Sequence, residues 1–492
     1  MDRRRTVIEC DSLVVGSGAG GAVAARELAL AGRAPVVVEE GPEAPDSDLA
    51  ARSPAENMRR LYRDAGLSPI HGRPAIAFGE GRCVGGTTVV NGGLLWHPPA
   101  DLLARWARRF GIDGYLAEHL APHAREITRR LSVHTHPERA PANRDSHLLA
   151  LGADALGWHT DGARRAIREC RHSNRCATGC PTGAKQSMAL TYLPEARRAG
   201  ARVHPNTRVV RLVHHAGVVT EVHAVGPGGR LLAYRPEVVF LAAGALCTPV
   251  LLQRSRVHER TAGRHTAFHV NVRLNARFAE PVRARDATIF TTQLREFAKL
   301  GILVMPANLT PGTLAAGFAG HPPHVLEGML ADIDRVGTYT AQVRMSGPLR
   351  IRALPGGGRL LRHRIRASDR DLLRFAVEQA ARVLFAAGAV EVYAPERQVL
   401  RGVDDVDTFA ARADPRRWDL VSVHAMASCP MGGADRGGMC DPYGRPYGLR
   451  NLHICDAAVL PGATGVSPQG TIMAFAHEIL ARHICAPAPV WR

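Results

Sequence analysis

A glycine-rich turn near the start of the chain limits the fold more than any other segment. An apolar run at 12–15 precedes Gly16, Gly18 and Gly21, which fit the pattern G-x-G-x-x-G, and an alanine-rich run at 22–31 follows. The first glycine permits a tight turn, the second lets the backbone approach a pyrophosphate, and the third lets a helix pack closely on a strand. We therefore expect a strand, a turn and a helix that bind a dinucleotide.

The residues after this helix support the same interpretation. Gly32 is placed to cap the helix, and an apolar run at 35–38 predicts a second strand that ends at Glu39. A carboxylate at this position can accept hydrogen bonds from ribose hydroxyls, and the unpaired N–H groups at the start of the helix attract phosphate. Strand, helix, strand and acid follow one another in the order that a dinucleotide pocket requires.

Length and charge exclude several other classes of protein. The chain has 492 residues, 46% of them hydrophobic, which is enough for two domains or for one large α/β domain with an insertion. The net charge of +18 comes almost entirely from arginine, since Lys185 and Lys299 are the only lysines. The arginines are spread along the chain instead of forming one basic block, so we expect no nucleic-acid partner.

The sequence contains no apolar stretch of the roughly 18 residues that would predict a membrane-spanning helix. Arg3, Arg4 and Arg5 resemble the start of a twin-arginine export signal, but the next apolar run is the nucleotide fingerprint itself, and its removal would destroy the pocket. Ten cysteines in a chain of this length do not suggest a secreted disulfide scaffold. We expect a cytoplasmic protein.

Two further segments have nucleotide-binding character. Residues 79–93 combine many glycines with hydroxyl and amide side chains, which indicates backbone that lies close to something flat or anionic. Residues 237–244 predict a buried strand that ends in a glycine turn, and Thr248 to Arg254 predict the next helix. This is a second strand-to-helix junction.

The remaining periodicities predict further elements. Helices are expected at 101–131 and after Asp145, paired strands at 202–213 and 217–225, a glycine-rich hairpin at 355–358, a long amphipathic helix at 368–387, a strand at 452–456, and a last helix at 470–484. Alternating segments between 276 and 420 indicate a separate module that carries a sheet.

These motifs together resemble the glucose-methanol-choline (GMC) oxidoreductases, flavoenzymes that oxidise alcohols with FAD, and the resemblance spans nearly the whole chain. It implies an α/β fold, α+β overall, with a Rossmann-like FAD-binding domain that is discontinuous in sequence and an antiparallel-sheet substrate domain with helices. The FAD-binding domain would comprise 6–100, 200–275 and 421–492, the substrate-binding domain 276–420, and a helical, cysteine-rich connecting region 101–199.

The resemblance also implies which residues hold FAD. The fingerprint would bind the ADP half, the block from Gly81 to Gly92 would wrap the flavin and pyrophosphate, and Asp456 would lie close to the ribityl chain. The implied cofactor-binding residues are Gly16, Gly18, Ala19, Gly21, Glu39, Gly81, Arg82, Gly86, Thr87, Asn91, Gly92, Val209, Ala243, Asp456, Pro468, Gln469 and Thr471.

The catalytic residues implied by the resemblance are His424 and Ser467. Alcohol oxidation needs a base for the hydroxyl proton while hydride leaves the carbon for flavin N5, and a histidine suits that task. Ser467 stands where the family has histidine or asparagine before proline, and serine cannot hold a proton charge as histidine can. His97 is an alternative source of a second contact to the substrate.

Three cysteines, Cys170, Cys176 and Cys180, lie within 11 residues. Some dehydrogenase subunits that resemble this family hold an iron–sulfur cluster on a very similar segment and pass electrons to a cytochrome. The other reading is a buried loop beside the flavin, with or without one disulfide. Three thiolates are one ligand short of a closed structural zinc site.

The sequence thus predicts an FAD-dependent alcohol oxidase or dehydrogenase. A lyase of the same fold, with FAD in a structural role, is the alternative from another class. A sugar or amino sugar in a biosynthetic pathway is the favoured substrate, with sterols and long-chain alcohols left open. The electron acceptor would be oxygen, a quinone or another carrier.

Overall fold

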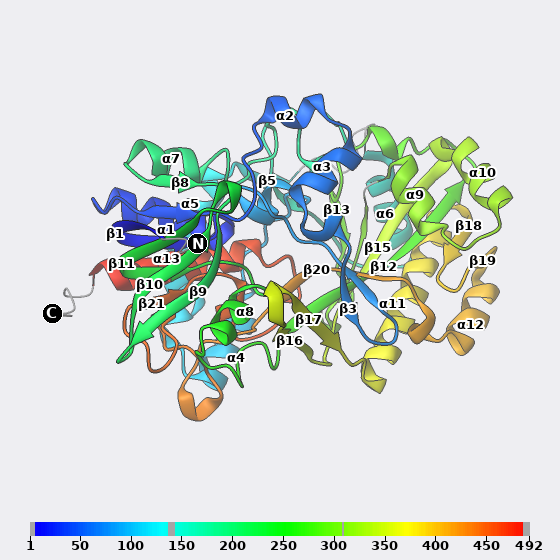
Figure 1. The fold of residues 1–492 in the computed structure, drawn as a ribbon. Helices are drawn as coiled ribbons and strands as arrows, with labels where there is room; N and C mark the ends of the chain where they lie inside the picture. Colours follow the sequence, from blue (N-terminus) through cyan, green and yellow to red (C-terminus); the bar gives the residue numbers. More distant parts are fainter. Residues whose placement is uncertain (1–4, 136–142, 308, 486–492) are drawn as a thin grey trace.

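The computed structural model describes residues 5–135, 143–307 and 309–485, so Arg3 and Arg4 of the arginine run lie outside the described residues. Two sheets form the frame of the molecule, and helices cover them (Figure 1). The helices are α1 (Ala19–Leu30), α2 (Asp46–Ala51), α3 (Pro54–Leu61), α4 (Ala100–Phe110), α5 (Ala117–Arg130), α6 (Arg144–Ala155), α7 (Tyr192–Arg198), α8 (Thr248–Arg254), α9 (Pro311–Gly317), α10 (Pro323–Ala331), α11 (Ala367–Ala386), α12 (Val403–Arg412) and α13 (Gln469–Cys485).

The first sheet has a parallel core extended by an antiparallel pair. Its strands, in spatial order, are β8 (Arg202–His204), β2 (Val36–Val38), β1 (Thr6–Val15), β11 (Leu231–Leu241), β10 (Val218–Val225) and β9 (Arg208–His215), and β21 (Leu452–Ile454) pairs with β11. The strands from β8 to β11 and β21 are parallel, whereas β10 and β9 are antiparallel. This arrangement confirms the predicted Rossmann-like fold.

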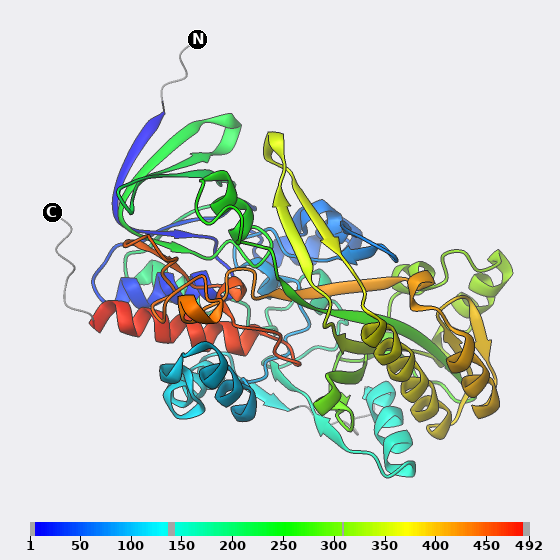
Figure 2. The ribbon, with the colours of Figure 1, turned by 90° about the horizontal axis from the view of Figure 1, so that it is seen from below.

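Strand burial explains why the parallel core forms. Val14, Val37 and Phe240 are fully buried in successive strands, as expected for parallel strands that are covered on both faces. Helix α1 contacts both α7 and α13, and Figure 2 shows α1 and α13 side by side along the sheet. The first and the last described helices of the chain therefore cover the same sheet.

The structure corrects two strand predictions in this sheet. Strand β1 begins at Thr6, not at residue 12, because its polar first half still pairs with β11 over Leu232 to Pro236. The strand expected at 202–213 is two strands, since Asn206 has a positive φ of 51° between β8 and β9. Periodicity missed both features, because it detects burial and not pairing.

The predicted cap of α1 is confirmed. Gly32 has a φ of 76°, its N–H donates to Ala29 O, and the N–H of Arg33 donates to Leu28 O. This is the Schellman arrangement, in which a glycine in the left-handed conformation satisfies the last carbonyls of a helix. The helix begins at Ala19, three residues before the predicted start, because the fingerprint glycines already belong to its first turn.

The second sheet is larger and mostly antiparallel. Its strands, in spatial order, are β16 (Leu349–Ala353), β17 (Arg359–His363), β3 (Ser68–His71), β4 (Ile76–Phe78), β20 (Leu420–Met426), β12 (Ala267–Phe278), β15 (Val336–Arg344), β14 (Ile302–Pro306), β13 (Thr292–Leu294) and β6 (Thr160–Gly162), with β18 (Ala389–Ala394) joined to β12 and β19 (Gln398–Leu400) joined to β18. Outside both sheets, β5 (Val133–Thr135) pairs with β7 (Arg164–Ala166).

The central strand of this sheet, β12, has two unlike faces. Alternate residues Val270, Val272 and Leu274 are fully buried in the hydrophobic core, and α11 packs against β12, β15 and β18. The residues between them are polar. An alternating strand with one covered face leaves the other face free for a binding site.

The division of the chain into domains stays a prediction, but the sheets show how the segments are distributed. Strands β3 and β4 lie within 6–100 and β6 lies within 101–199, yet all three belong to the second sheet. The hairpin β16–β17 forms as expected around 355–358, and it projects in yellow in Figure 2. Helix α11 matches the helix expected at 368–387 to within one residue.

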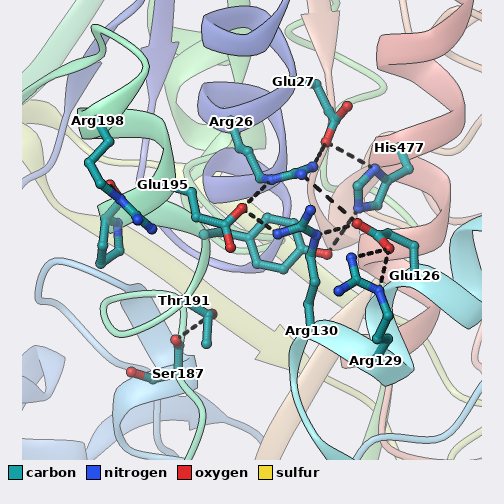
Figure 3. A network of polar contacts seen from close by, with 12 residues as sticks. Arg26, Glu27, Glu126, Arg129, Arg130, Ser187, Thr191, Glu195, Arg198 and His477 are labelled. Carbon is teal, nitrogen blue, oxygen red and sulfur yellow. Dashed lines mark hydrogen bonds and ion pairs between the residues drawn. The ribbon is translucent and has the colours of Figure 1, made fainter.

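A charged network joins the helices α1, α5, α7 and α13 (Figure 3). Arg26 of α1 lies 2.7 Å from Glu195 of α7, and Arg130 of α5 contacts both Glu195 and Glu126. His477 of α13 faces Glu27 at 3.6 Å. Each buried cation in this network has carboxylate partners, so the network ties α1, α5, α7 and α13 together without leaving a buried charge unpaired.

None of the helices in the described residues is long and apolar enough to cross a membrane.

Candidate active site

A cavity of about 1640 Å³ is lined by residues of both sheets. Pockets for drug-sized ligands measure roughly 300–1,000 Å³, so this cavity has room for a large cofactor together with a substrate. We call the part beside the glycine fingerprint the nucleotide end, and the part over strands β12, β15 and β20 the substrate end. The two ends differ in what lines them.

Two fingerprint glycines, Gly16 and Gly21, and the neighbouring Gly20 are required by close backbone contacts. Gly16 has a φ of 98°, and a Cβ there would lie 2.3 Å from the carbonyl oxygen of Ala242. A Cβ on Gly20 would lie 1.7 Å from the carbonyl oxygen of Cys455, and one on Gly21 would lie 2.0 Å from that of Gly16. The turn and the start of α1 therefore press against two neighbouring strand ends, which leaves no space for side chains.

The start of α1 is open to an anion. Gly18 is the N-cap residue and offers no side-chain hydrogen bond, and the first turn contains no acidic residue. The first N–H groups of the helix therefore point into the nucleotide end without a side-chain acceptor, which is the arrangement that binds phosphate. This geometry fits the pyrophosphate of FAD.

Glu39 lies at the end of β2, as predicted, and lines the cavity. Its Oε2 accepts hydrogen bonds from the N–H and hydroxyl of Ser17, at 3.1 and 2.7 Å, and its Oε1 accepts from the N–H of Gly41 at 2.9 Å. Burial raises the pKa of this carboxyl, and the three hydrogen bonds oppose that effect. Glu39 thus also fixes the fingerprint turn, a role that its sequence position did not reveal.

The second glycine block contacts the fingerprint directly. Gly86 has a φ of 58°, and a Cβ there would lie 2.8 Å from the Cα of Gly18. Thr87 Oγ1 accepts a hydrogen bond from the N–H of Gly81, and Asn91 Nδ2 donates to Oε1 of Gln469 at 2.7 Å. The block therefore connects the first turn of α1 with the start of α13.

Asp456 joins the second strand-to-helix junction to the C-terminal strand. Its Oδ2 accepts hydrogen bonds from the N–H of Gly244 and the hydroxyl of Thr248, at 2.7 and 2.6 Å. Its Oδ1 accepts from the N–H of Ala458. Burial raises the pKa of Asp456, and these hydrogen bonds oppose that effect only in part. The carboxylate thus joins two separate segments of the chain at the cavity wall, 244–248 and 456–458.

Most residues expected to hold the cofactor lie in the wall of the cavity. They are Gly16, Gly18, Ala19, Glu39, Gly81, Arg82, Gly86, Thr87, Asn91, Gly92, Val209, Ala243, Asp456, Pro468 and Gln469. Gly21 and Thr471 are not in the lining. Gly21 acts behind the wall, where it allows α1 to approach Gly16, and the hydroxyl of Thr471 is buried without a hydrogen-bond partner among the described residues.

His424 reaches the substrate end from strand β20 and lines the cavity. It pairs across the strands with His269 of β12, and the two Nδ1 atoms lie 3.2 Å apart. Burial lowers the pKa of His424 to about 4, and burial followed by the neighbouring His424 and Arg344 lowers the pKa of His269 well below its usual value. Both imidazoles are therefore neutral at pH 7.

Of the two Nδ1 atoms that face each other, only one can carry a proton and donate a hydrogen bond to the other. When His424 Nδ1–H donates to His269 Nδ1, the Nε2 of His424 keeps its lone pair and can accept a proton from a ligand. In the opposite arrangement Nε2 of His424 would carry the proton and could not act as a base. His269 was missed in the sequence because no motif includes it; only its cross-strand register with His424 gives it a role.

The second predicted catalytic residue, Ser467, also lines the cavity, and its hydroxyl donates to the carbonyl oxygen of Leu94 at 3.3 Å. The alternative, His97, does not: it lies beside a separate pocket, and its Nε2 is 2.8 Å from the hydroxyl of Thr128. Of the two sources considered for a second contact, only Ser467 is in place.

A row of polar side chains on β12 and β15 lines the substrate end and was also missed. Asn271, Arg273 and Asn275 of β12 stand opposite Gln342, Thr340 and Thr338 of β15, and all of these except Thr338 line the cavity. Alternation along each strand is visible in the sequence. Which face meets a ligand is not, because that depends on where the two sheets meet.

The cysteine segment forms a buried support under the glycine block. Lys185 Nζ donates to the carbonyl oxygens of Val89, Asn91 and Cys176 at 2.6 to 2.7 Å. All ten cysteines are free thiols, so no disulfide forms there. Among the described residues no group of three or more His, Cys, Asp or Glu side chains could hold a metal ion, and the expected iron–sulfur ligands Cys170, Cys176 and Cys180 are thus not supported.

The nucleotide end and the substrate end, with its histidine pair, belong to one cavity between two sheets. This arrangement defines the class of dinucleotide-dependent oxidoreductases. Comparison with known families gives the same class. Models of the GMC oxidoreductase family match residues 58–271 and 356–476. The chain belongs to the GMC oxidoreductase family, and it is an FAD-dependent oxidoreductase that acts on CH–OH groups.

Individual relatives agree with this assignment. The chain is 33% identical over 485 residues to an uncharacterized GMC-type oxidoreductase of Sinorhizobium fredii, covering 96% of this chain and 94% of the relative. It is 27% identical over 522 residues to a long-chain-alcohol oxidase of Arabidopsis thaliana, covering 98% and 68%. Its fold is similar to the crystal structure of pyridoxine 4-oxidase from Mesorbium loti, with a TM-score of 0.72, 19% identity, and coverage of 96% and 99%.

Proposed function

We propose that this protein oxidises the CH–OH group of a polar alcohol to a carbonyl, with His424 as the base. The observation that supports this most directly is the His424–His269 pair, because it leaves one nitrogen of His424 free at the cavity surface. The residues at the nucleotide end would hold FAD. When bound, FAD supplies the acceptor for the hydride that leaves the substrate carbon.

His424 has two tasks in this scheme. Its Nε2 takes the proton of the substrate hydroxyl, while its Nδ1–H stays bonded to Nδ1 of His269. The two hydrogen bonds fix the imidazole plane, so the ring needs no rearrangement before proton transfer. No carboxylate contributes to the pKa of either histidine, and a neutral imidazole is the form that can act as a base.

Ser467 would contribute orientation and not proton transfer. Its hydroxyl proton is directed to Leu94 O, so its oxygen can accept a hydrogen bond from the substrate hydroxyl but cannot accept and hold a proton at neutral pH. His424 therefore carries the acid–base chemistry alone. This division differs from a pair of titrating residues, and we expect it to give a single acidic limb in the pH profile.

The lining of the substrate end favours a substrate with several polar groups. Three amide side chains, of Asn271, Asn275 and Gln342, and the hydroxyl of Thr340 face the cavity. Amides can donate and accept, which suits the hydroxyls of a sugar. A long unbranched alkyl chain would offer these groups no hydrogen bond, at a cost of about 1–3 kcal/mol for each group that it removes from water and that has no partner in the protein. Asn275 is the exception in part, because its Oδ1 already accepts from the hydroxyl of Thr338.

The decisive experiment is anaerobic mixing of the FAD-loaded enzyme with a panel of alcohols, followed by the flavin absorbance. We expect polyhydroxylated alcohols to bleach the flavin and the His424→Ala variant to retain FAD without bleaching. A lyase of this fold would consume substrate without a change in flavin absorbance. Absence of bleaching by every alcohol class, with consumption of a cyanohydrin, would replace our proposal by the lyase.

Electron acceptors can be ranked in the same apparatus. Once the flavin is reduced, oxygen, a quinone or a one-electron dye is added, and the rate of reoxidation is recorded. Rapid reoxidation by oxygen identifies an oxidase, and slow reoxidation by oxygen with rapid reoxidation by the quinone identifies a dehydrogenase.

A further inference from the structure

Arg273 is the one cation in the polar row of β12 and β15 at the substrate end. It stands between Asn271 and Asn275 on the same face of the strand, lines the cavity and is partly buried. Its only hydrogen bond within the described residues is from Nη1 to the carbonyl oxygen of Thr313, at 2.8 Å. The remaining N–H groups of its guanidinium are thus available to a ligand.

Unlike Arg63 and Arg359 of the cavity wall, Arg273 has no carboxylate among the described residues that balances its charge. Arg63 lies 2.7 Å from Glu40 and 2.7 Å from Glu80, and Arg359 also contacts Glu80. In the described part of the chain no carboxylate forms an ion pair with Arg273, and burial alone lowers its pKa. A cation that is partly removed from water without a counter-charge carries a desolvation cost, which an anionic ligand would offset.

Two other charged residues of the cavity wall do not fill this role. Glu396 and Asp419 also line the cavity, but Oε1 of Glu396 accepts from the N–H of Asp414 and from Nε1 of Trp418, at 2.6 and 2.9 Å. Asp419 is exposed to solvent. Neither contributes to the pKa of Arg273.

Arg273 is also placed away from the nucleotide end. Its guanidinium lies under helix α9, where a Cβ on Gly317 would be 3.4 Å from its Cδ. Along β12 it is four residues beyond His269, the partner of His424, which corresponds to roughly 13 Å of extended strand. An FAD phosphate at the start of α1 is thus not its ligand, whereas a substrate whose hydroxyl meets His424 extends toward it.

We infer that the substrate is an alcohol that carries a carboxylate or phosphate group, which Arg273 binds while the reacting hydroxyl lies at His424. This inference rests on the proposed function and narrows it. Asn271 and Asn275 would hydrogen-bond the polar groups that flank the anion. An amino sugar, which is a cation at neutral pH, is disfavoured by the same arginine.

Matched pairs of alcohols test the inference. For the phosphate arm, α-glucosyl phosphate is compared with methyl α-glucoside; for the carboxylate arm, gluconate is compared with glucitol. Both members of each pair keep the same primary hydroxyl. We expect the charged member of at least one pair to reduce the flavin of the FAD-loaded enzyme with a KM about tenfold to a hundredfold lower than that of its neutral partner.

Substitution then assigns the preference to one side chain. Arg273→Gln should abolish the preference by raising the KM of the charged alcohol alone, and Arg273→Lys should restore part of it, because the ammonium keeps the charge but not the forked donors. Arg277→Gln is the matched control: Arg277 lies on the same strand, but Glu391 pairs with it at 3.1 Å and it is not part of the cavity wall.

A binding experiment separates this inference from the proposed function. Glutarate has no hydroxyl to oxidise, and its binding is measured by the perturbation of the flavin spectrum in the wild type and in Arg273→Gln. If the anion binds more weakly to Arg273→Gln than to the wild type, the anion site is supported even when no alcohol bleaches the flavin. Equal effects of Arg273→Gln on charged and neutral ligands, or a wild-type preference for neutral alcohols in both pairs, would overturn the inference.

Discussion

The two ends of the cavity are built from different parts of the chain. At the nucleotide end the wall is largely main chain, with glycines packed so closely that a Cβ on Gly20 would lie 1.7 Å from a neighbouring carbonyl oxygen. At the substrate end the wall is made of side chains on regular strands, such as His424 on β20 and Arg273 on β12. Main-chain walls tolerate no added atoms, whereas side-chain walls can be exchanged while the strand stays intact.

Each kind of change is therefore expected to act at its own end of the cavity. Substitutions at the nucleotide end should remove FAD altogether, and substitutions at the substrate end should leave FAD bound while they alter the reaction. The contrast should be strongest where the wall is most tightly packed and weakest where only a titration is changed.

The largest effect is expected for Gly20→Ala. The added Cβ would overlap the backbone of Cys455, so α1 must move away from the cavity and the phosphate site is lost. We expect purified Gly20→Ala to contain no FAD, measured by absorbance after denaturation. Gly328→Ala is the control, because a Cβ in α10 meets nothing within 4 Å. Normal FAD content in Gly20→Ala would break the contrast at its strongest point.

His424→Ala should come next. Removal of a general base lowers the rate of reaction by about 10²–10⁴-fold, while the nucleotide end is unchanged. We expect normal FAD content and a loss of that size in the rate of flavin reduction under anaerobic conditions. A variant with normal turnover would remove His424 from the mechanism.

His269 should act on the reaction through His424. In His269→Leu the acceptor for His424 Nδ1–H is lost, so the imidazole can adopt the wrong tautomer, and we expect kcat to fall about tenfold with little change in KM. His269→Asn keeps an acceptor oxygen close to the place of Nδ1 and should recover much of the rate. Equal losses in both variants would mean that His269 serves only packing.

The smallest effect concerns pH. Burial lowers the pKa of His424 to about 4, so the basic form persists well below the usual value of 6.5, and kcat/KM should stay level down to about pH 5. Below pH 4 it should fall tenfold for each pH unit. An inflection near 6.5 in the kcat/KM profile would show that His424 is not buried as described, or that another group is the base.

Acid stability has to be measured beside that profile. Burial lowers the pKa of His453 and of His477 to about 3, so each stays neutral in the folded protein while its unfolded counterpart takes up a proton below pH 6.5. The unfolded state then binds more protons, and the free energy of unfolding decreases as pH falls, by about 1.4 kcal/mol per pH unit for each such histidine. Circular dichroism at each pH separates this loss from the titration of His424.

The sequence predicted the nucleotide end well because that end depends on local backbone geometry. Gly21 and Glu39 act through close contacts and hydrogen bonds within one strand–helix–strand unit, which has a recognisable pattern, whereas the contact of Gly16 with Ala242 reaches a second strand. It predicted His424 through resemblance alone. Its position over the cavity depends on β20 lying between β4 and β12, which no local pattern encodes.

The substrate end could not be predicted, because it too depends on the order of strands in the second sheet. Asn271 and Arg273 are ordinary alternating polar residues until β15 and β20 are placed on either side of β12. For the cysteine segment the spacing left two readings open, and the structure agrees with the buried loop: Arg165 donates to Cys176 Sγ, and Lys185 donates to the carbonyl oxygen of Cys176.

The contact between Asn91 and Gln469 has a consequence for how the enzyme is made. These residues are 378 positions apart, and the second closes the pocket that the first begins. At about 5–20 residues per second, a ribosome needs roughly 20–75 s to synthesise the intervening chain. Helix α13 can cover helix α1 only after this interval, so the pocket is complete only once translation has passed residue 469. We therefore expect FAD to be retained by the finished chain and not by shorter nascent chains.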